Sequence, residues 1–418
     1  MSTPPKIRYI SECFIKPQYA LEESKRPFYL SPWDLTMLSV HYIQKGLLYN
    51  KPSSADAQED FIKSLLDKLK QSLSVALVHF YPLSGRLVTQ INENPPSSLV
   101  FVDCSNSPGA KFIYAALDMT ISDVLSPIDV PPIVQSFFDH DKAVNHDGHT
   151  RPLLTVQAQG NNISLTRPPI HKRWFPDGGP ILNLPFKHQD EFISRFEAPK
   201  LRERMFHFSS ESIAKLKAKA NAESNTNKIS SFQSLSALVW RCITRARHLP
   251  HDQITHCRLA INNRARMEPH LPNDYFGNSI SAGAAVTTAG ELLEHSLGWA
   301  AWKLHELVAN HTDKVVRGWL DNWLKSPFVY QLDRLFDPHS VMMGSSPRFN
   351  KYGNEFGMGK AVALRSGYAN KFDGKVSSYP GKEEGSIDLE MCLPPDSMSA
   401  LESDEEFMDA VSLSHQLH

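Results

Sequence analysis

The strongest structural signal in the sequence is an apolar residue at every fourth position from 61 to 77, with charged residues between them. The apolar residues are Phe61, Leu65, Leu69, Leu73 and Leu77. This spacing predicts an amphipathic helix that packs one face on a core. Pro82 and Gly85 then interrupt the helical pattern, and "RLVTQI" resumes as a strand. The sequence therefore predicts an α/β protein in which helices and strands are mixed.

Two more helices and a C-terminal strand are predicted from similar patterns. Ser230 and Gln233 have the spacing of a capping box at the start of a helix. A third helix is predicted over about residues 291–310. Apolar and polar residues alternate over residues 387–393, which predicts a half-buried strand that ends before two prolines. The acidic run "ESDEEF" is typical of the solvated first turn of a final helix.

The length of the chain, 418 residues, exceeds one ordinary core and suggests two domains. Leu153, Leu154 and Val156 predict a buried strand. From Thr166 to Arg202 the chain is rich in proline and has no sustained periodicity, so we interpret 166–202 as a crossover linker. The predicted domains are therefore residues 1–165, truncated near 157/158, and residues 203–418.

Charge, cysteine content and hydropathy exclude several classes of function. Lys and Arg total 44 and Asp and Glu total 45, so nucleic acid is not an expected partner. The five cysteines are scattered and form no C-x-x-C pair, which favours a reducing compartment over a disulfide framework or a zinc site. Neither a signal-peptide core nor eighteen consecutive apolar residues occur, so we expect a cytoplasmic protein with no membrane span. We also expect a monomer.

Common catalytic and ligand-binding motifs do not fit the sequence. G-x-S-x-G is absent, and "GNEFGMGKA" lacks both the spacing and the Ser or Thr of a phosphate loop. None of the 18 histidines stands in H-E-x-x-H. His140, His146 and His149 gather in a polar segment, which indicates solvated surface more than a metal site. We expect neither a metal nor a bound cofactor.

Six stretches together resemble a known family. They are "YLSPWDLTMLSVHYIQKGLLY", "HFYPLSGRLV", "KRWFPDGGPILNLPF", "FQSLSALVWRCITRAR", "LAINNRARMEPHLPNDYFGNSI" and "NEFGMGKAVALRSGY". In order and spacing they resemble the plant BAHD family of acyl-CoA-dependent acyltransferases, over nearly the whole chain. The resemblance implies two α/β domains of the chloramphenicol acetyltransferase type with a channel between them. It also implies acyl-CoA as cosubstrate and, as acceptor, a hydroxyl or amine of a plant specialised metabolite or lipid-type molecule.

The resemblance also implies roles for particular residues. In the family, a histidine in H-x-x-x-D-G takes the proton from the acceptor as general base, and the aspartate of the motif pairs with an arginine. By motif match that arginine is Arg264, in "INNRARM". Two of the five positions of the family's structural D-F-G-W-G element depart from it here. The corresponding residues are Glu355, Phe356, Gly357, Met358 and Gly359.

The H-x-x-x-D-G motif is missing from its expected place. In the family, a strand like "RPLLTVQ" continues into more strand, the motif and a helix before a stretch like "QAQGNNISLTRPPIHKRWFP". Here Gln157 and Ala158 join the two ends directly. We therefore assign no catalytic residue, and we expect Arg264 to meet Glu355 or solvent because its carboxylate partner is lost.

One literal H-x-x-x-D stands elsewhere, from His248 to Asp252 in "HLPHD". Gln253 replaces the glycine of the motif, and family members use this stretch as a surface connection. A general base must reach the proton that it removes, so we do not regard His248 as catalytic.

Three interpretations are open. The first is an acyltransferase by descent. The second is an inactive chain, produced by alternative splicing or by a gene model from which sequence was wrongly removed, and the flush junction favours it. The third is a relative whose channel binds a small molecule or supports a reaction that needs no histidine base, such as elimination.

Overall fold

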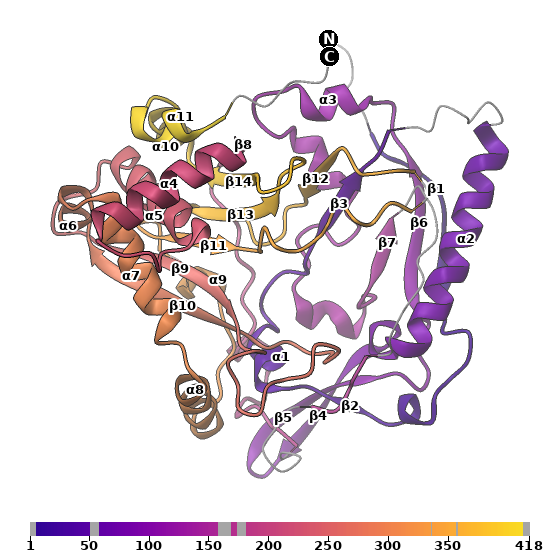
Figure 1. Ribbon diagram of the computed structural model, residues 1–418. Coiled ribbons are helices and arrows are strands. Elements are labelled where there is room, and N and C mark those ends of the chain that lie inside the picture. The colour runs from indigo at the N-terminus through magenta and orange to yellow at the C-terminus, as the bar shows by residue number, and fades with distance from the viewer. Residues whose placement is uncertain are drawn as a thin grey trace.

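The computed structural model describes residues 6–50, 58–157, 169–173, 181–335, 337–356 and 358–412. Its largest element is a six-stranded mixed sheet at the left of Figure 1. In spatial order the strands are β10 (Ile280–Thr288), β9 (Ile254–Asn262), β11 (Val341–Gly344), β13 (Lys375–Pro380), β14 (Ile387–Leu393) and β8 (Arg202–Phe208). β11 pairs in parallel with β9 and β13, and the other pairs are antiparallel.

Helices cover one face of this sheet and enclose the largest core of the molecule (Figure 1). They are α4 (Ser210–Glu223), α5 (Ser231–Ala246), α7 (Leu297–Ala309), α10 (Pro395–Glu402) and α11 (Glu405–Ala410). The predicted capping box is confirmed, because Ser230 accepts from the Gln233 backbone and Gln233 accepts from the Ser230 backbone. Burial of α5 among the others explains why its sequence is apolar over most of its surface.

Two sequence predictions in this half need correction. The helix predicted over 291–310 is two helices, α6 (Ala289–Glu294) and α7, because Ser296 caps a new helix by accepting from the Trp299 backbone. The final helix, α11, begins after Asp404 as predicted, but its acidic first turn is not simply solvated. Arg245 binds Asp404 at 2.5 Å and Glu406 at 2.6 Å.

The strand predicted at residues 387–393 is confirmed as β14, but it is buried on both faces. Glu390 and Cys392, predicted to face solvent, are each only 2% exposed. Alternation identifies one covered face and cannot reveal that the other face is covered too. The second face of β14 therefore lies against other polar groups of the protein.

The N-terminal half contains smaller sheets (Figure 1). One has three strands in the order β1 (Arg8–Ile15), β6 (Ala110–Ala116) and β7 (Thr155–Gln157). The predicted amphipathic helix is α2 (Gln58–His79), and Leu66 and Leu69 pack on Phe112 of β6. A two-stranded sheet joins β3 (Lys45–Leu48) to β12 (Ala363–Ser366), which comes from far along the chain.

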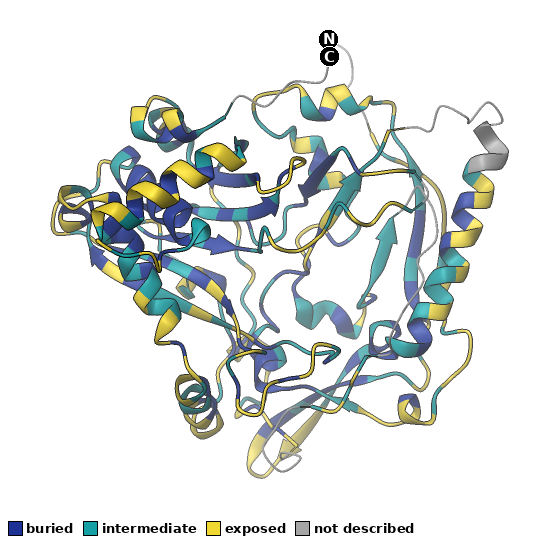
Figure 2. Ribbon diagram, in the orientation of Figure 1, coloured by how far each residue is buried: buried dark blue, intermediate teal, exposed yellow. Residues whose placement is uncertain are grey.

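The strand predicted from Leu153, Leu154 and Val156 is β7, which has three residues and is half-buried, not buried. β7 pairs only with β6 among the described strands. Figure 2 shows β7 in the teal of intermediate burial, whereas β14 is mostly dark blue. A strand with one neighbour keeps one edge and part of its surface uncovered, which explains the difference.

A third small sheet in the order β2 (Phe28–Tyr29), β5 (Pro96–Asp103) and β4 (Arg86–Glu93) contains the predicted "RLVTQI" strand. The described part of the proposed crossover packs on it. Leu184 exchanges two backbone hydrogen bonds with Ser98, and Leu182, Leu184 and Phe192 are buried in its core. The remaining helices are α1 (Pro32–Thr36), α3 (Ile121–Leu125), α8 (Asp313–Lys325) and α9 (Leu332–Leu335).

Candidate functional site

Arg264 lies in the loop after β9, where the sequence predicted a residue without its carboxylate. Its guanidinium donates to the carbonyl oxygens of Gly277 at 2.8 Å and Tyr275 at 3.3 Å. It also lies 5.8 Å from the Tyr275 ring centre. Neither Glu355 nor another carboxylate of the described residues pairs with it, so the expected contact with Glu355 is wrong. Main-chain carbonyls accept from Nη2 of Arg264 without supplying a negative charge.

The segment that matches D-F-G-W-G lies beside α2 and β6, and Gly357 falls outside the described residues. Phe356 packs on the core cluster of α2 and β6 and meets the Tyr49 ring edge-on, with 6.1 Å between ring centres. Glu355 is exposed, and the backbone of Met358 donates to its carbonyl. Gly359 has a φ of 77°, which suits glycine. The segment is a turn that brings one aromatic ring into the core.

The H-x-x-x-D from His248 to Asp252 lies in the loop between α5 and β9. Both residues are exposed. Within the loop, His251 Nε2 lies 2.8 Å from Glu294 Oε1, and both side chains are largely exposed. The structure therefore agrees with the expected surface position of this stretch.

A second H-x-x-x-D, from His270 to Asp274 in "HLPND", escaped the sequence reading and could have been found by a literal search. It lies in the loop between β9 and β10, and Tyr275 follows it in place of the glycine. His270 is exposed, and its Nδ1 lies 2.7 Å from the Met267 carbonyl. Neither literal match places its histidine inside the protein.

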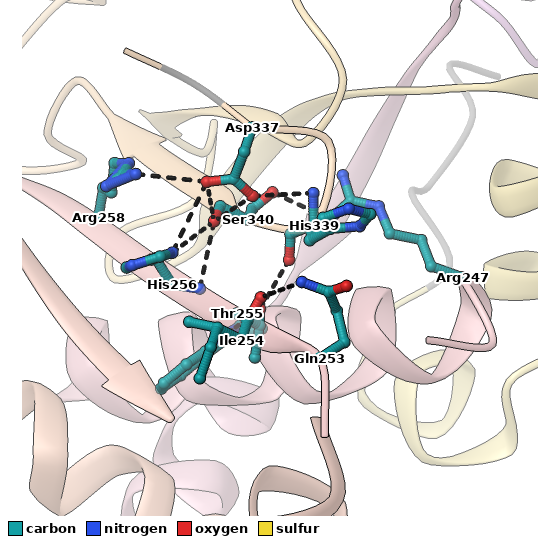
Figure 3. Close-up of polar contacts among 10 residues, drawn as sticks. Arg247, Gln253, Ile254, Thr255, His256, Arg258, Asp337, His339 and Ser340 are labelled. Atoms are coloured by element: carbon teal, nitrogen blue, oxygen red, sulfur yellow. Dashed lines mark hydrogen bonds and ion pairs between the residues drawn. The ribbon is translucent and has the colours of Figure 1, made fainter. Parts of the chain in front are cut away.

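A cluster of serine, histidine and aspartate joins the start of β9 to the loop before β11 (Figure 3). Ser340 Oγ donates to Asp337, with oxygens at 2.7 and 2.8 Å, and lies 3.0 Å from His256 Nδ1. Asp337 is ionised because, although burial raises its pKa, the Ser340 and His339 hydrogen bonds lower the pKa below its usual value. The hydroxyl proton of Ser340 is therefore committed to Asp337, so His256 must donate from Nδ1. His256 therefore cannot act as the base that would activate Ser340 as a nucleophile.

The three clustered histidines are not solvated surface, so that prediction is wrong. His140 is 6% exposed and its Nε2 lies 2.9 Å from the Thr155 hydroxyl. His149 Nε2 lies 2.8 Å from the Thr89 hydroxyl, and burial and His149 lower the pKa of His146 to about 4. The polar sequence could not show that β4 and β7 pack on this segment. No three His, Cys, Asp or Glu side chains within the described ranges are arranged to hold a metal.

The sequence and the fold were compared with those of known proteins. Residues 5–160 and 172–408 match the profile of the family described as "Transferase family". An "uncharacterized acetyltransferase" of Arabidopsis thaliana is 33% identical over 445 residues, covering 96% of this chain and 99% of that protein. "BAHD acyltransferase DCR" of the same plant is 30% identical, covering 96% of this chain and 92% of that protein.

A structural likeness agrees with the sequence matches. The structure of F. sporotrichioides TRI101 complexed with coenzyme A and T-2 superimposes with a TM-score of 0.68, at 18% identity, over 92% of this chain and 99% of that one. The fold is therefore the two-domain α/β fold of the chloramphenicol acetyltransferase type, and the predicted fold class is confirmed. The chain belongs to the Transferase family of BAHD acyltransferases.

The helices within the described ranges were also tested as membrane spans. None of them is long and apolar enough to cross a bilayer.

Proposed function

We propose that this chain is an acyl-CoA-dependent acyltransferase by descent that lacks the general-base histidine of its family and does not transfer acyl groups at an enzymatic rate. The observation that carries the proposal is the position where the family match divides. The match stops at residue 160 and resumes at residue 172, just after β7. The sequence resemblance puts the family's H-x-x-x-D-G motif at this place.

The lengths of the matched proteins support the same reading. The match to the Arabidopsis acetyltransferase extends over 445 residues, more than the 418 residues of this chain. The relative therefore contains residues that have no counterpart here. A segment removed between Gln157 and Ala158 accounts both for this difference and for the divided family match.

His248, His270 and His256 do not offer a buried substitute base at the loop of Arg264. His248 and His270 are exposed on loops. His256 keeps Nε2 as a proton acceptor, but it lies near the start of β9, whereas Arg264 follows the end of that strand. Eight residues of extended chain span about 25 Å. A general base must lie within hydrogen-bonding reach of its proton, about 3 Å, so His256 is too far from the loop of Arg264 to serve.

The test is an acyl-transfer assay of the purified 418-residue chain. Aliphatic and aromatic acyl-CoAs are combined with phenolic, alcoholic and amine acceptors, and release of free CoA thiol is followed. We expect release no faster than in the absence of protein. Acceptor-dependent release of CoA by this chain would overturn the proposal. Conversion of an acceptor without any acyl-CoA would instead favour a reaction that needs no base.

A matched chimera distinguishes a missing base from a misfolded chain. The segment of the Arabidopsis relative that has no counterpart here is inserted between Gln157 and Ala158. We expect acyl transfer to rise at least about 10²-fold, the lower range of general-base catalysis. A second chimera, with the inserted motif histidine changed to alanine, should fold equally well and remain inactive. Transcripts are also sequenced across the codons of Gln157 and Ala158. The result shows whether the 418-residue chain or a longer chain with the H-x-x-x-D-G motif is made.

A further inference from the structure

The face of the six-stranded sheet that points away from its helices carries charged side chains. On β13, Val376 belongs to the helix-covered core, so Lys375 and Tyr379 point to the opposite face by alternation. On β14, Met391 belongs to the core, and Glu390 points to the opposite face. β3 and β12 contribute polar groups to this face, as the contacts of Glu390 and Tyr379 show.

Glu390 is the centre of a buried polar network. It accepts from Ser366 Oγ at 2.6 and 2.8 Å and from Tyr379 Oη at 2.5 Å, and Lys371 Nζ lies 2.9 Å away. Burial and Glu390 raise the pKa of Glu203, the second carboxylate, to about 8. Lys371 Nζ also contacts Glu203, so both buried carboxylates of the network lie against Lys371, and neither lies within 4.0 Å of another described lysine.

Three more lysines lie on this side of the sheet, and we call Lys45, Lys351 and Lys375 the lysine cluster. Lys45 and Lys351 contact Tyr379, and Lys375 lies beside Gly344 and close enough to Lys45 for their charges to interact. Lys45 Nζ donates to Tyr379 Oη at 2.6 Å. Lys351 Nζ donates to Ser345 Oγ at 2.7 Å and lies 4.4 Å from the Tyr379 ring centre. Among the described residues, no carboxylate lies within 4.0 Å of any of the three ammonium groups. Their immediate partners are neutral.

The backbone after β11 is shaped around these lysines. A Cβ at Gly344 would lie 2.1 Å from Lys375 Nζ, so the absence of a side chain at this position makes room for the ammonium group. The next residue, Ser345, has a φ of 64°, which is uncommon for a residue other than glycine. This strained conformation orients the hydroxyl that binds Lys351. A missing side chain at Gly344 and an unusual backbone conformation at Ser345 thus lie next to each other beside the same cluster.

We propose that the lysine cluster binds an anionic oxygen group, a carboxylate or a phosphate. Positive groups gathered in a partly buried place without counter-charges are costly, and a bound anion removes this cost. Lys45 is exposed, whereas Lys351 and Lys375 are half-buried, so the cluster is open to solvent at Lys45. No residue of this cluster was singled out from sequence, because β3, the loop after β11 and β13 bring its members together only in the fold.

The titration of the cluster supports the same conclusion. Burial and the neighbouring Lys45 lower the pKa of Lys351 and of Lys375 to about 8. The other titratable groups that face the cluster are Glu203, Lys371, Tyr379, Glu390 and Cys392. Because an anion favours the charged lysines, affinity should be highest below pH 8 and fall as the pH rises through it.

The test is calorimetric titration of the whole 418-residue chain with three probes at pH 7. Benzoate and benzyl alcohol have similar shapes and differ in charge, and inorganic phosphate represents the second source of the anion. We expect benzoate or phosphate to bind and benzyl alcohol not to bind. Tighter benzoate binding identifies a carboxylate site, and tighter phosphate binding identifies a phosphate site. Equal binding of benzoate and benzyl alcohol, or no binding of either anion, would overturn the proposal.

Variants locate the binding on the cluster. Lys375→Met and Lys351→Met should each weaken anion binding about tenfold or more, the effect of losing one charge-assisted hydrogen bond. Lys351→Arg keeps the charge and should keep the binding. Lys219→Met, on the exposed surface of α4, is the control and should bind like the unaltered chain. Unchanged affinity of both methionine variants at the cluster would contradict the assignment. Calorimetry detects binding without turnover, so its result is independent of whether the chain has a general base.

Discussion

The six-stranded sheet and the N-terminal sheets differ in how many of their strands pair with two neighbours. In the six-stranded sheet, β9, β11, β13 and β14 each pair with two strands, and helices cover a continuous core. In the N-terminal half, β7 pairs only with β6 and β3 only with β12 among the described strands. The half in which the family match runs without a break has the complete sheet. The half that contains the divided match has the shorter sheets, in which β3 and β7 lack a second partner within the part of the chain that the structure describes.

Three of the buried polar atoms without hydrogen-bond partners among the described residues lie beside β3 and β7, and most of the others lie in the C-terminal half. Tyr42, just before β3, stacks on His140, with 4.5 Å between ring centres, and His140 binds Thr155 of β7. Tyr42 Oη, His140 Nδ1 and Gln157 Oε1 are all buried, and none has a hydrogen-bond partner among the described residues. Such orphans are rare in native proteins. We infer that β3 and β7 flank a strand position that no described residue fills.

The largest expected difference between the two regions concerns apolar truncations. Met391→Ala, at a position that is 0% exposed in β14, should cost about 2–5 kcal/mol because it leaves a cavity. Val156→Ala, in half-buried β7, should cost about 1 kcal/mol, because only part of the removed surface was covered. The two variants are compared by urea unfolding monitored by circular dichroism. A loss at Val156 as large as that at Met391 would contradict the half-buried state of β7.

Buried charge sharpens the same comparison. Glu390→Gln removes one of the two buried carboxylates that contact Lys371 and should lower the free energy of unfolding by about 1.5–3 kcal/mol, the contribution of hydrogen bonds to a charged group. Thr155→Val, its counterpart beside β7, removes the hydroxyl contact to His140 and should cost about 1 kcal/mol. Urea unfolding of both variants measures the contrast. Equal losses of unfolding free energy would contradict the expected difference between the two sheets.

Two histidines should respond to pH with opposite signs. The Asp388 hydrogen bond, at 2.7 Å, raises the pKa of His207 in the folded state, so its stabilisation is present below the unfolded value of about 6.5 and is lost as the pH rises through the raised pKa. Burial lowers the pKa of His140, so the folded state loses stability as the pH falls below about 6.5.

The matched variants His207→Gln and His140→Gln test these signs. Unfolding midpoints are measured at about pH 8 and about pH 5. Relative to the unaltered chain, His207→Gln should be less stable at the lower pH, by about 1 kcal/mol or less. His140→Gln should lose less stability than the unaltered chain as the pH is lowered. Parallel responses of the two variants would refute the assigned environments.

Local sequence patterns predicted the elements that depend on nearby residues. The capping box at Ser230 and the amphipathic α2 follow from spacings of three and four residues, and both are present in the structure. The break at Ser296 was missed because an apolar pattern continued across it, although a serine cap is a local signal that a closer reading could have used. Residue spacing therefore predicted an element correctly where the contacts that define the element lie within one helix.

The polar sites could not be predicted, because their partners come from distant segments. Arg264 binds carbonyls of residues 275 and 277, which no motif specifies. The lysine cluster needs β3, β11 and β13 together, and its members are separated by up to several hundred residues of sequence. His140 became buried because β7 packs on it, although its own neighbours in sequence are polar. The composition of a segment does not show which other segments pack on it in the fold.

Amide hydrogen exchange at β3 and β7 tests the unfilled strand position most directly. The 418-residue chain and the chimera with the inserted segment are compared, with β13 and β14 as internal references. Edge amides exchange faster than amides held between two strands. We predict that β3 and β7 exchange much faster than β13 and β14 in the 418-residue chain and become protected in the chimera. Protection of β3 and β7 equal to that of β13 in the chain without the insert would contradict the account.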